Sequence, residues 1–152
     1  MNRVDIGCVD IEEPLWLDAM EAWAQKVMMA LDIDGWDLSL ALCGDETIKT
    51  LNASYRNKDE ATDVLSFESG DHWEDPDFGS RILAGDIIIS LDSLAKNAEY
   101  FGVSMDEELR RLIVHGILHL KGMDHESNNA DEPMLECQEA LLQTLVGEHI
   151  IQ

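Results

Sequence analysis

The feature that most constrains this chain is a group of three histidines in the stretch HGILHLKGMDH, residues 115–125. His115 and His119 are four positions apart, so on a helix their side chains leave the same face about 5–6 Å apart. A third ring on the next helical turn would crowd the first two, so it must come from chain that has turned back. Gly122 supplies the turn, and His125 follows it. The spacing therefore predicts a helix that ends at this glycine, with three imidazoles converging beside its end.

Three converging imidazoles form a ligand set for a divalent metal ion. Each ring nitrogen reaches an ion at about 2.0–2.1 Å, and three protein ligands leave one coordination position open for water or substrate. Imidazole-only ligation favours Zn²⁺, with Ni²⁺, Co²⁺ or Fe²⁺ as alternatives. Asp124, beside the third histidine, has two possible roles. It accepts a hydrogen bond from the remote nitrogen of a ligand ring, or it caps the turn that follows.

The simpler interpretation is three core or surface histidines that share this spacing by chance. The turn glycine and the position of the third histidine argue against it. His72 and His149, the two remaining histidines, lie far from the triplet in the sequence. We expect both to be solvated and outside the site.

The rest of the chain alternates segments with the residue patterns of strands and helices. Strands are expected at residues 3–9, 35–44, 64–68 and 81–90. Helices are expected at about residues 14–31, 45–56, 91–100, 104–122 and 131–150. This alternation predicts one α/β domain over residues 1–152, with a mixed, mostly parallel four-stranded sheet packed against about five helices.

Local signals place the ends of these elements. Asp45 and Ser90 are expected helix N-caps, and Ser104 and Glu107 have the spacing of a capping box. Residues 68–79 hold five acidic residues, one proline and two glycines. That composition predicts an exposed loop between two strands.

Composition also bears on compartment and partners. No apolar run approaches the roughly 20 residues that a membrane-spanning helix needs, and the first ten residues lack the apolar stretch of a signal peptide. The three cysteines, Cys8, Cys43 and Cys137, form no C-x-x-C pair. The expectation is a cytoplasmic protein with no membrane partner, no disulfide framework and no thiolate zinc site.

The histidine spacing equals that of the metzincin peptidases, H-E-x-x-H-x-x-G-x-x-H, except at one position. The glutamate that acts as their general base is replaced here by Gly116. Without that carboxylate the usual route for moving a proton from metal-activated water to a leaving nitrogen is closed. We also expect this glycine to leave open space beside the ion for a phosphodiester. Peptide hydrolysis is therefore disfavoured.

Three blocks of the sequence resemble the bacterial YbeY family, also called endoribonuclease YbeY or rRNA maturation factor. HGILHLKGMDH is similar to the family's H-G-x-L-H-L-x-G-[YH]-D-H. LNASYRNKDEATDVLSF is similar to L-N-x-x-Y-R-x-x-D-x-x-T-D-V-L-S-F, and LAGDIIIS is similar to L-G-D-I-x-I-S. The likeness covers about residues 35–145. Met123, Ala61 and Glu68 depart from residues common in the family, and none of the three is an expected metal ligand.

The resemblance implies an α/β fold with a zinc-type ion held by His115, His119 and His125. It implies cleavage of single-stranded RNA in rRNA maturation, ribosome biogenesis and ribosome quality control, with the small ribosomal subunit or its assembly factors as partners. It also points to Arg56 as a catalytic residue. Charge chemistry is consistent with that role, because a guanidinium can bind two oxygens of a phosphate whose charge grows during cleavage.

The formal net charge of −22 conflicts with an RNA substrate, because such a surface repels polyanions. A local basic site or a carrier partner must then supply the affinity. Five of the ten basic residues fall in or near the motif blocks and are expected to form a small basic groove: Arg56, Lys58, Arg110, Arg111 and Lys121.

Two further function classes fit the same residues. One is a zinc-dependent hydrolase of another substrate, peptide or small phosphoester. The other is a non-catalytic ribosome-assembly factor in which the metal is structural. For the hydrolase, activity on such a substrate should disappear with His119→Ala. For the assembly factor, Arg56→Ala should leave function intact, whereas His115→Ala should unfold the domain.

Overall fold

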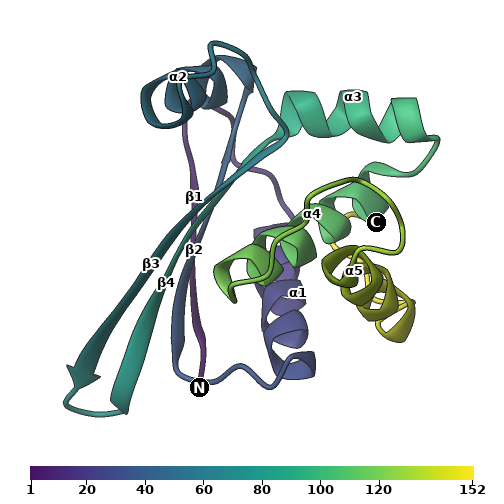
Figure 1. The fold of residues 1–152 in the computed structure, drawn as a ribbon. Coiled ribbons are helices and arrows are strands. Elements are labelled where there is room, and N and C mark those ends of the chain that lie inside the picture. Colours follow the sequence, from purple (N-terminus) through teal and green to yellow (C-terminus); the bar gives the residue numbers. More distant parts are fainter.

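A computed structural model describes all 152 residues, 1–152. Its centre is one open sheet of four strands in the order β1–β2–β4–β3 (Figure 1). β1 (Arg3–Cys8), β2 (Trp36–Cys43) and β4 (Gly79–Ser90) are parallel, and β3 (Val64–Asp75) runs antiparallel to β4 at the edge. The predicted mixed, mostly parallel four-stranded sheet in a single α/β domain is confirmed.

The domain has five helices, as expected; the first four pack against the sheet, and the fifth packs against the fourth. They are α1 (Leu17–Ala30), α2 (Asp45–Arg56), α3 (Leu91–Phe101), α4 (Met105–Leu120) and α5 (Pro133–Thr144). α2 lies on the opposite side of the sheet from α1, α4 and α5 (Figure 1). None of these helices combines the length and apolar character needed to span a membrane.

Successive side chains of β4 point to opposite faces of the sheet, and each face has its own apolar cluster. Ile87 and Ile89 are buried in the main core, together with side chains of α1, α4 and α5. Ile88 points the other way and packs against the smaller cluster formed by Cys43, Ile48 and Leu65 under α2. The apolar run of β4 is thus covered on both sides, as parallel central strands usually are.

The loop predicted at residues 68–79 is wrong. Residues 68–75 continue β3, and the chain returns as β4 from Gly79, so the two strands form a long hairpin. Contacts with a residue distant in the sequence stabilise this hairpin. The Nε1–H of Trp73 donates to Asp37 at 2.8 Å, and the buried Arg81 guanidinium pairs with the same carboxylate at 2.9 Å. Local composition gave no sign of these partners.

Helix ends also differ from the sequence expectation in places. α1 begins at Leu17 rather than near residue 14, and α5 spans Pro133–Thr144 rather than 131–150. The N-cap of α2 is Gly44, whereas Asp45 accepts hydrogen bonds from the Ser90 and Ser93 hydroxyls at 2.7 and 2.5 Å. Asp45 therefore ties α2 to α3. All three cysteines are free, as expected.

Candidate functional site

α4 carries the first two histidines, and its N-cap and its terminal glycine turn lie where the sequence predicts. Ser104 is the N-cap, and its hydroxyl accepts a hydrogen bond from the backbone N–H of Glu107 at 3.0 Å. At the other end Gly122 has φ +101°, a conformation that favours glycine. The N–H of Met123 then bonds to the carbonyl of Leu118 at 3.0 Å, which directs the chain back along the helix.

This turn brings the three imidazoles together. The Nε2 atoms of His115 and His119 are 3.0 Å apart. One ring nitrogen from each of the three histidines lies within 4.8 Å of the other two. The ring centroids of His115 and His125 are 5.2 Å apart. The convergence expected from the spacing is therefore present.

Each of the three rings has its Nδ1 next to a carbonyl oxygen. His115 Nδ1 lies 2.8 Å from Gln138 Oε1, His119 Nδ1 lies 3.1 Å from the carbonyl of Met123, and His125 Nδ1 lies 2.8 Å from that of Ser127. A carbonyl oxygen only accepts, so each Nδ1 carries the hydrogen and each neutral ring keeps the lone pair of Nε2 free. Two of these lone pairs then face each other at 3.0 Å. A cation between them would convert this repulsion into ligation.

Burial and neighbouring groups favour the unprotonated form of two of these rings. Burial lowers the pKa of His115, and the neighbouring His119 and His125 lower it further. Burial likewise lowers the pKa of His119, to which Arg56 also contributes. A lowered pKa means that the neutral, ligating form persists to lower pH.

Asp124 bonds to the backbone rather than to a ligand ring. Its Oδ1 accepts a hydrogen bond from the backbone N–H of His125 at 2.8 Å, whereas His119 Nδ1 is 4.0 Å away. The carbonyl of Met123 is the hydrogen-bond partner of that ring. The departure from the family pattern at Met123 therefore leaves the orientation of His119 intact, because only the backbone is used.

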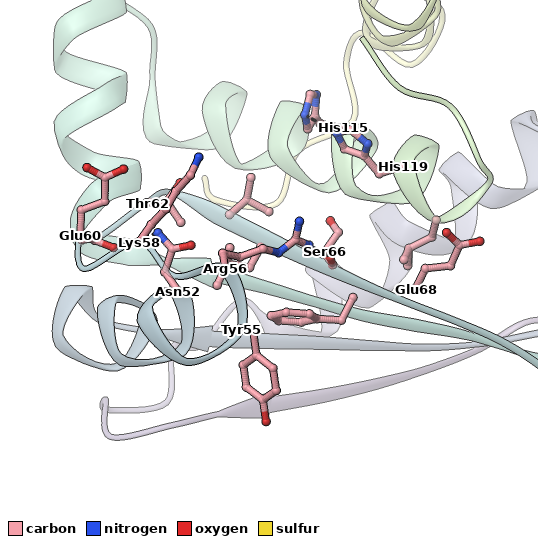
Figure 2. Close-up of a pocket in the computed structure, with 15 residues that line it drawn as sticks. Asn52, Tyr55, Arg56, Lys58, Glu60, Thr62, Ser66, Glu68, His115 and His119 are labelled. Atoms are coloured by element: carbon pink, nitrogen blue, oxygen red, sulfur yellow. Dashed lines mark hydrogen bonds between the residues drawn. The ribbon is translucent and has the colours of Figure 1, made fainter. Parts of the chain in front are cut away.

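His115 and His119 form one wall of a cleft of about 830 Å³ (Figure 2). The opposite wall comes from the end of α2, the segment after it and the start of β3. Most of its lining is polar, and it includes Asn52, Arg56, Lys58, Glu60, Thr62, Ser66 and Glu68. Ala61 and Glu68, two of the departures from the family pattern, thus line the cleft.

Arg56 lies across the cleft from the histidines, at the last residue of α2 (Figure 2). Its Nη2–H donates to the carbonyl of Ser66 at 2.7 Å, and its guanidinium carbon lies 5.5 Å from the centroid of the Phe67 ring. These contacts orient an otherwise exposed side chain and engage one guanidinium N–H in a hydrogen bond. The other guanidinium N–H groups are left for a ligand.

The predicted groove of five basic residues is wrong for three of them. Arg56 and Lys58 line the cleft. Arg110 is buried and paired with Asp106 at 2.9 Å, and Arg111 is paired with Glu107 and Glu139, each at 3.0 Å. The Lys121 ammonium donates to the carbonyl of Leu31. Position near a motif therefore did not indicate which face of α4 each cation occupies.

The open space expected beside Gly116 is absent. A Cβ at this position would lie 2.7 Å from Cδ1 of Ile87, so the glycine allows α4 to pack closely against β4. A glutamate would not fit there. The packing therefore excludes the glutamate base of the metzincin peptidases from this position.

Two residues play parts that sequence reasoning missed or misjudged. Gln138 of α5 contacts His115, although it lies 23 positions further along the chain, and no local pattern marks it. His149 is not simply solvated, because its Nδ1 lies 2.9 Å from Asp106 Oδ2. His72 is exposed on β3, as expected.

Fold and site together define an α/β domain with three convergent imidazoles, two of which line an open cleft opposite an arginine. The family model described as Endoribonuclease YbeY matches residues 8–146. The chain belongs to the endoribonuclease YbeY family.

Relatives named Endoribonuclease YbeY are similar over most of their length. One from Treponema denticola is 53% identical over 93% of this chain and 92% of its own, and one from Aquifex aeolicus is 43% identical over 76% and 73%. The solution structure of a protein from Thermotoga maritima superposes with a TM-score of 0.65 at 28% identity. It covers 97% of this chain and 91% of its own.

Proposed function

We propose that this protein is a metal-dependent, single-strand-specific endoribonuclease that acts in rRNA maturation, ribosome biogenesis and ribosome quality control. His115, His119 and His125 would hold one Zn²⁺ or another divalent ion, and Arg56 would bind the scissile phosphate. One observation carries the proposal. Three imidazoles have Nδ1 committed to carbonyl oxygens and Nε2 free, beside a cleft that contains an arginine.

The residues fit the proposed ion. Nitrogens at about 2.0–2.1 Å from a tetrahedral Zn²⁺ lie about 3.3 Å from one another. The observed Nε2 separation of 3.0 Å and the 4.8 Å limit for the set bracket that value. Small side-chain rotations therefore suffice for ligation. When bound, such an ion polarises a phosphoryl oxygen or activates a water molecule.

Arg56 supplies the complementary charge. A guanidinium presents paired N–H groups that match two oxygens of a phosphate, and it interacts more strongly as negative charge grows on them. The Ser66 carbonyl and the Phe67 ring hold this group across from the histidines. A cleft with the imidazoles on one wall and the guanidinium on the other fits a single extended strand between α4 and β3.

The charge distribution supports a carrier partner. Only two cations line the cleft within a chain of formal charge −22. Two phosphate contacts give modest, salt-sensitive affinity for RNA. We therefore propose that the small ribosomal subunit or an assembly factor delivers the rRNA, and that the reaction takes place in the cytoplasm.

The test combines elemental analysis of the purified protein with cleavage of single-stranded RNA, with and without small ribosomal subunits. We expect about one metal ion per chain in the wild type and in Arg56→Ala, and loss of the ion in His119→Ala. Cleavage should fall at least about 100-fold in both variants, the size typical of a lost transition-state contact. Two matched controls lie outside the cleft: exposed His72→Ala, and Lys49→Ala on α2.

Other outcomes identify the competing functions. Cleavage that survives both cleft substitutions contradicts the proposal. Activity on a peptide or a small phosphoester that disappears with His119→Ala, without any RNA cleavage, would assign the hydrolase alternative. Ribosome assembly that tolerates Arg56→Ala but fails with an unfolded His115→Ala would assign a structural metal.

A further inference from the structure

Gln138 is the only side chain among the partners of the three Nδ1 atoms. His119 and His125 are oriented by the backbone carbonyls of Met123 and Ser127. His115 depends instead on the side-chain amide of Gln138, which reaches across from α5 and is only 6% exposed. The orientation of His115 is thus the one that a side-chain substitution can change.

The amide of Gln138 is itself held in one direction. Its Nε2–H donates to Glu139 Oε2 at 3.1 Å. Both oxygens of Glu139 accept from Arg111, Oε2 from Nε and Oε1 from Nη2, each at 3.0 Å. Arg111 also donates from Nη1 to Glu107 at 3.0 Å. Four residues of α4 and α5 thus form one continuous chain of hydrogen bonds that ends on His115.

The charge state of Glu139 gives this chain its direction. Burial alone would raise the pKa of Glu139, but the hydrogen bonds from Arg111 and Gln138 outweigh it and lower the pKa. The ionised carboxylate only accepts, so the NH₂ end of the Gln138 amide must face it. The carbonyl end then faces His115 and accepts from Nδ1–H.

We propose that Gln138 is the positioning residue of His115, and that the Arg111–Glu139 pair fixes its amide so that Nε2 of His115 presents a lone pair to the cleft. The consequence for catalysis rests on the proposed function. The tautomer itself does not, because it is set by hydrogen bonds within the protein.

A specific competing arrangement shows why such a device is needed. His115 Nε2 and His119 Nε2 are 3.0 Å apart, which is hydrogen-bond distance. If the hydrogen of His115 moved to Nε2, it would bond to His119 and occupy both lone pairs. A metal ion would then have to displace this hydrogen bond. Gln138 opposes it, because its carbonyl would lose the donor at Nδ1.

The first test reads the tautomer in the metal-free protein. Two-bond ¹⁵N–¹H correlation spectra at neutral pH distinguish protonated from unprotonated ring nitrogens. We expect His115 to be protonated at Nδ1 in the wild type and in Gln143→Met, an exposed glutamine-to-methionine control on the same helix. In Gln138→Met a large Nε2–H population should appear. An unchanged His115 spectrum in a folded Gln138→Met protein overturns the proposal.

The second test measures Zn²⁺ affinity by competition with a chelator. Gln138→Met should weaken binding about 10- to 100-fold, the usual effect of losing an outer hydrogen bond to a ligand histidine. The exchanged pair Gln138→Glu with Glu139→Gln keeps an acceptor for Nδ1–H and should recover most of the affinity. Wild-type affinity in Gln138→Met contradicts the proposal.

Glu139→Gln provides a second test in case Gln138→Met does not fold. It keeps the packing of α5 but lets the amide of Gln138 turn over, so we expect a smaller change in the same direction. No change in tautomer or affinity would count against the proposed chain. A wild-type protein that binds no Zn²⁺ would refute the proposed function, whereas the metal-free spectra would still decide whether Gln138 positions His115.

Discussion

Gly116 shows how one residue can be assigned correctly for chemistry and wrongly for geometry. The sequence showed that a general base is missing at this position. The structure shows that the glycine faces Ile87 of β4 rather than open space. Its lack of a side chain lets α4 lie close to the sheet. This spacing in turn sets where His115 and His119 stand in the wall of the cleft.

Gly116→Ala is expected to lower the free energy of unfolding by about 1–3 kcal/mol, the cost of overpacking a core. A Cβ would lie 2.7 Å from Cδ1 and 3.0 Å from Cγ1 of Ile87, a fully buried β-branched residue of β4. Urea denaturation of the metal-free protein measures the effect.

The double variant with Ile87→Val tests the cause. Valine lacks the Cδ1 atom that makes the closest contact, so part of the loss should be recovered relative to the sum of the single changes. Strict additivity of the two changes would show that the contact with Ile87 is not the source.

At the scale of elements, hydrogen bonds also fix the first turn of α4 to the rest of the domain. Asp106, in its first turn, accepts hydrogen bonds from the backbone N–H groups of Ile150 and Ile151 at 2.6 and 2.8 Å. Its other oxygen lies 2.9 Å from both Arg110 Nε and His149 Nδ1. One buried carboxylate thus fastens the end of the chain to the helix that carries the site.

We expect Asp106→Asn to lower the free energy of unfolding by about 1.5–3 kcal/mol at neutral pH. Burial alone would raise the pKa of Asp106, but the hydrogen bonds that it accepts outweigh burial and lower the pKa. A lowered pKa in the folded state contributes stability that is present above the unfolded-state value of about 3.9 and is lost as the pH falls through the folded value.

Denaturation of wild type and Asp106→Asn at several pH values measures this contribution. The difference between the two proteins should shrink as the pH falls below about 4, where the Asp106 carboxylate becomes protonated. A difference that persists undiminished at the most acidic pH would contradict this assignment.

The β3–β4 hairpin is the element that local reasoning placed least well. Its acidic residues and turn formers are typical of loops, yet β3 continues through Asp75. Gly85 adopts φ +139° where the carbonyl of Phe67 lies 2.1 Å from the position of a Cβ, so only glycine is tolerated where the register of β3 and β4 shifts. This irregularity lies beside Phe67, the residue that supports Arg56.

At the scale of the whole molecule, charge limits what the cleft can bind. The chain has 32 acidic and 10 basic residues, and two of the five cations near the motif blocks, Arg110 and Arg111, are engaged in ion pairs. Arg56 and Lys58 are left in the cleft. The protein therefore has a small positive site within a strongly negative surface.

Binding of naked single-stranded RNA should be weak and only moderately salt-dependent. Two phosphate contacts predict a slope of about −1.4 in a plot of log K against log salt concentration. Fluorescence anisotropy across a salt series measures it, and Lys58→Ala should reduce the slope by about half. Tight binding that persists at high salt would show a larger nucleic-acid surface than the structure provides.

Several features followed from the sequence by itself because they depend on neighbours along the chain. Period and capping signals gave the alternating elements and both ends of α4, and the turn glycine gave the convergence of three histidines. The blocks around Arg56 and the histidines gave the family. Each of these rests on contacts within a few residues, where spacing translates directly into geometry.

Tertiary structure alone decided the features that depend on distant partners. It paired the acidic segment into a hairpin through Asp37, placed Gly116 against Ile87, and turned Arg110 and Arg111 away from the cleft. It also brought Gln138 to His115 across 23 residues. The physical reason is common to all of them. A side chain is buried by, or bonds to, whichever groups the fold brings within a few ångströms, and the spacing of residues along the chain does not identify those groups.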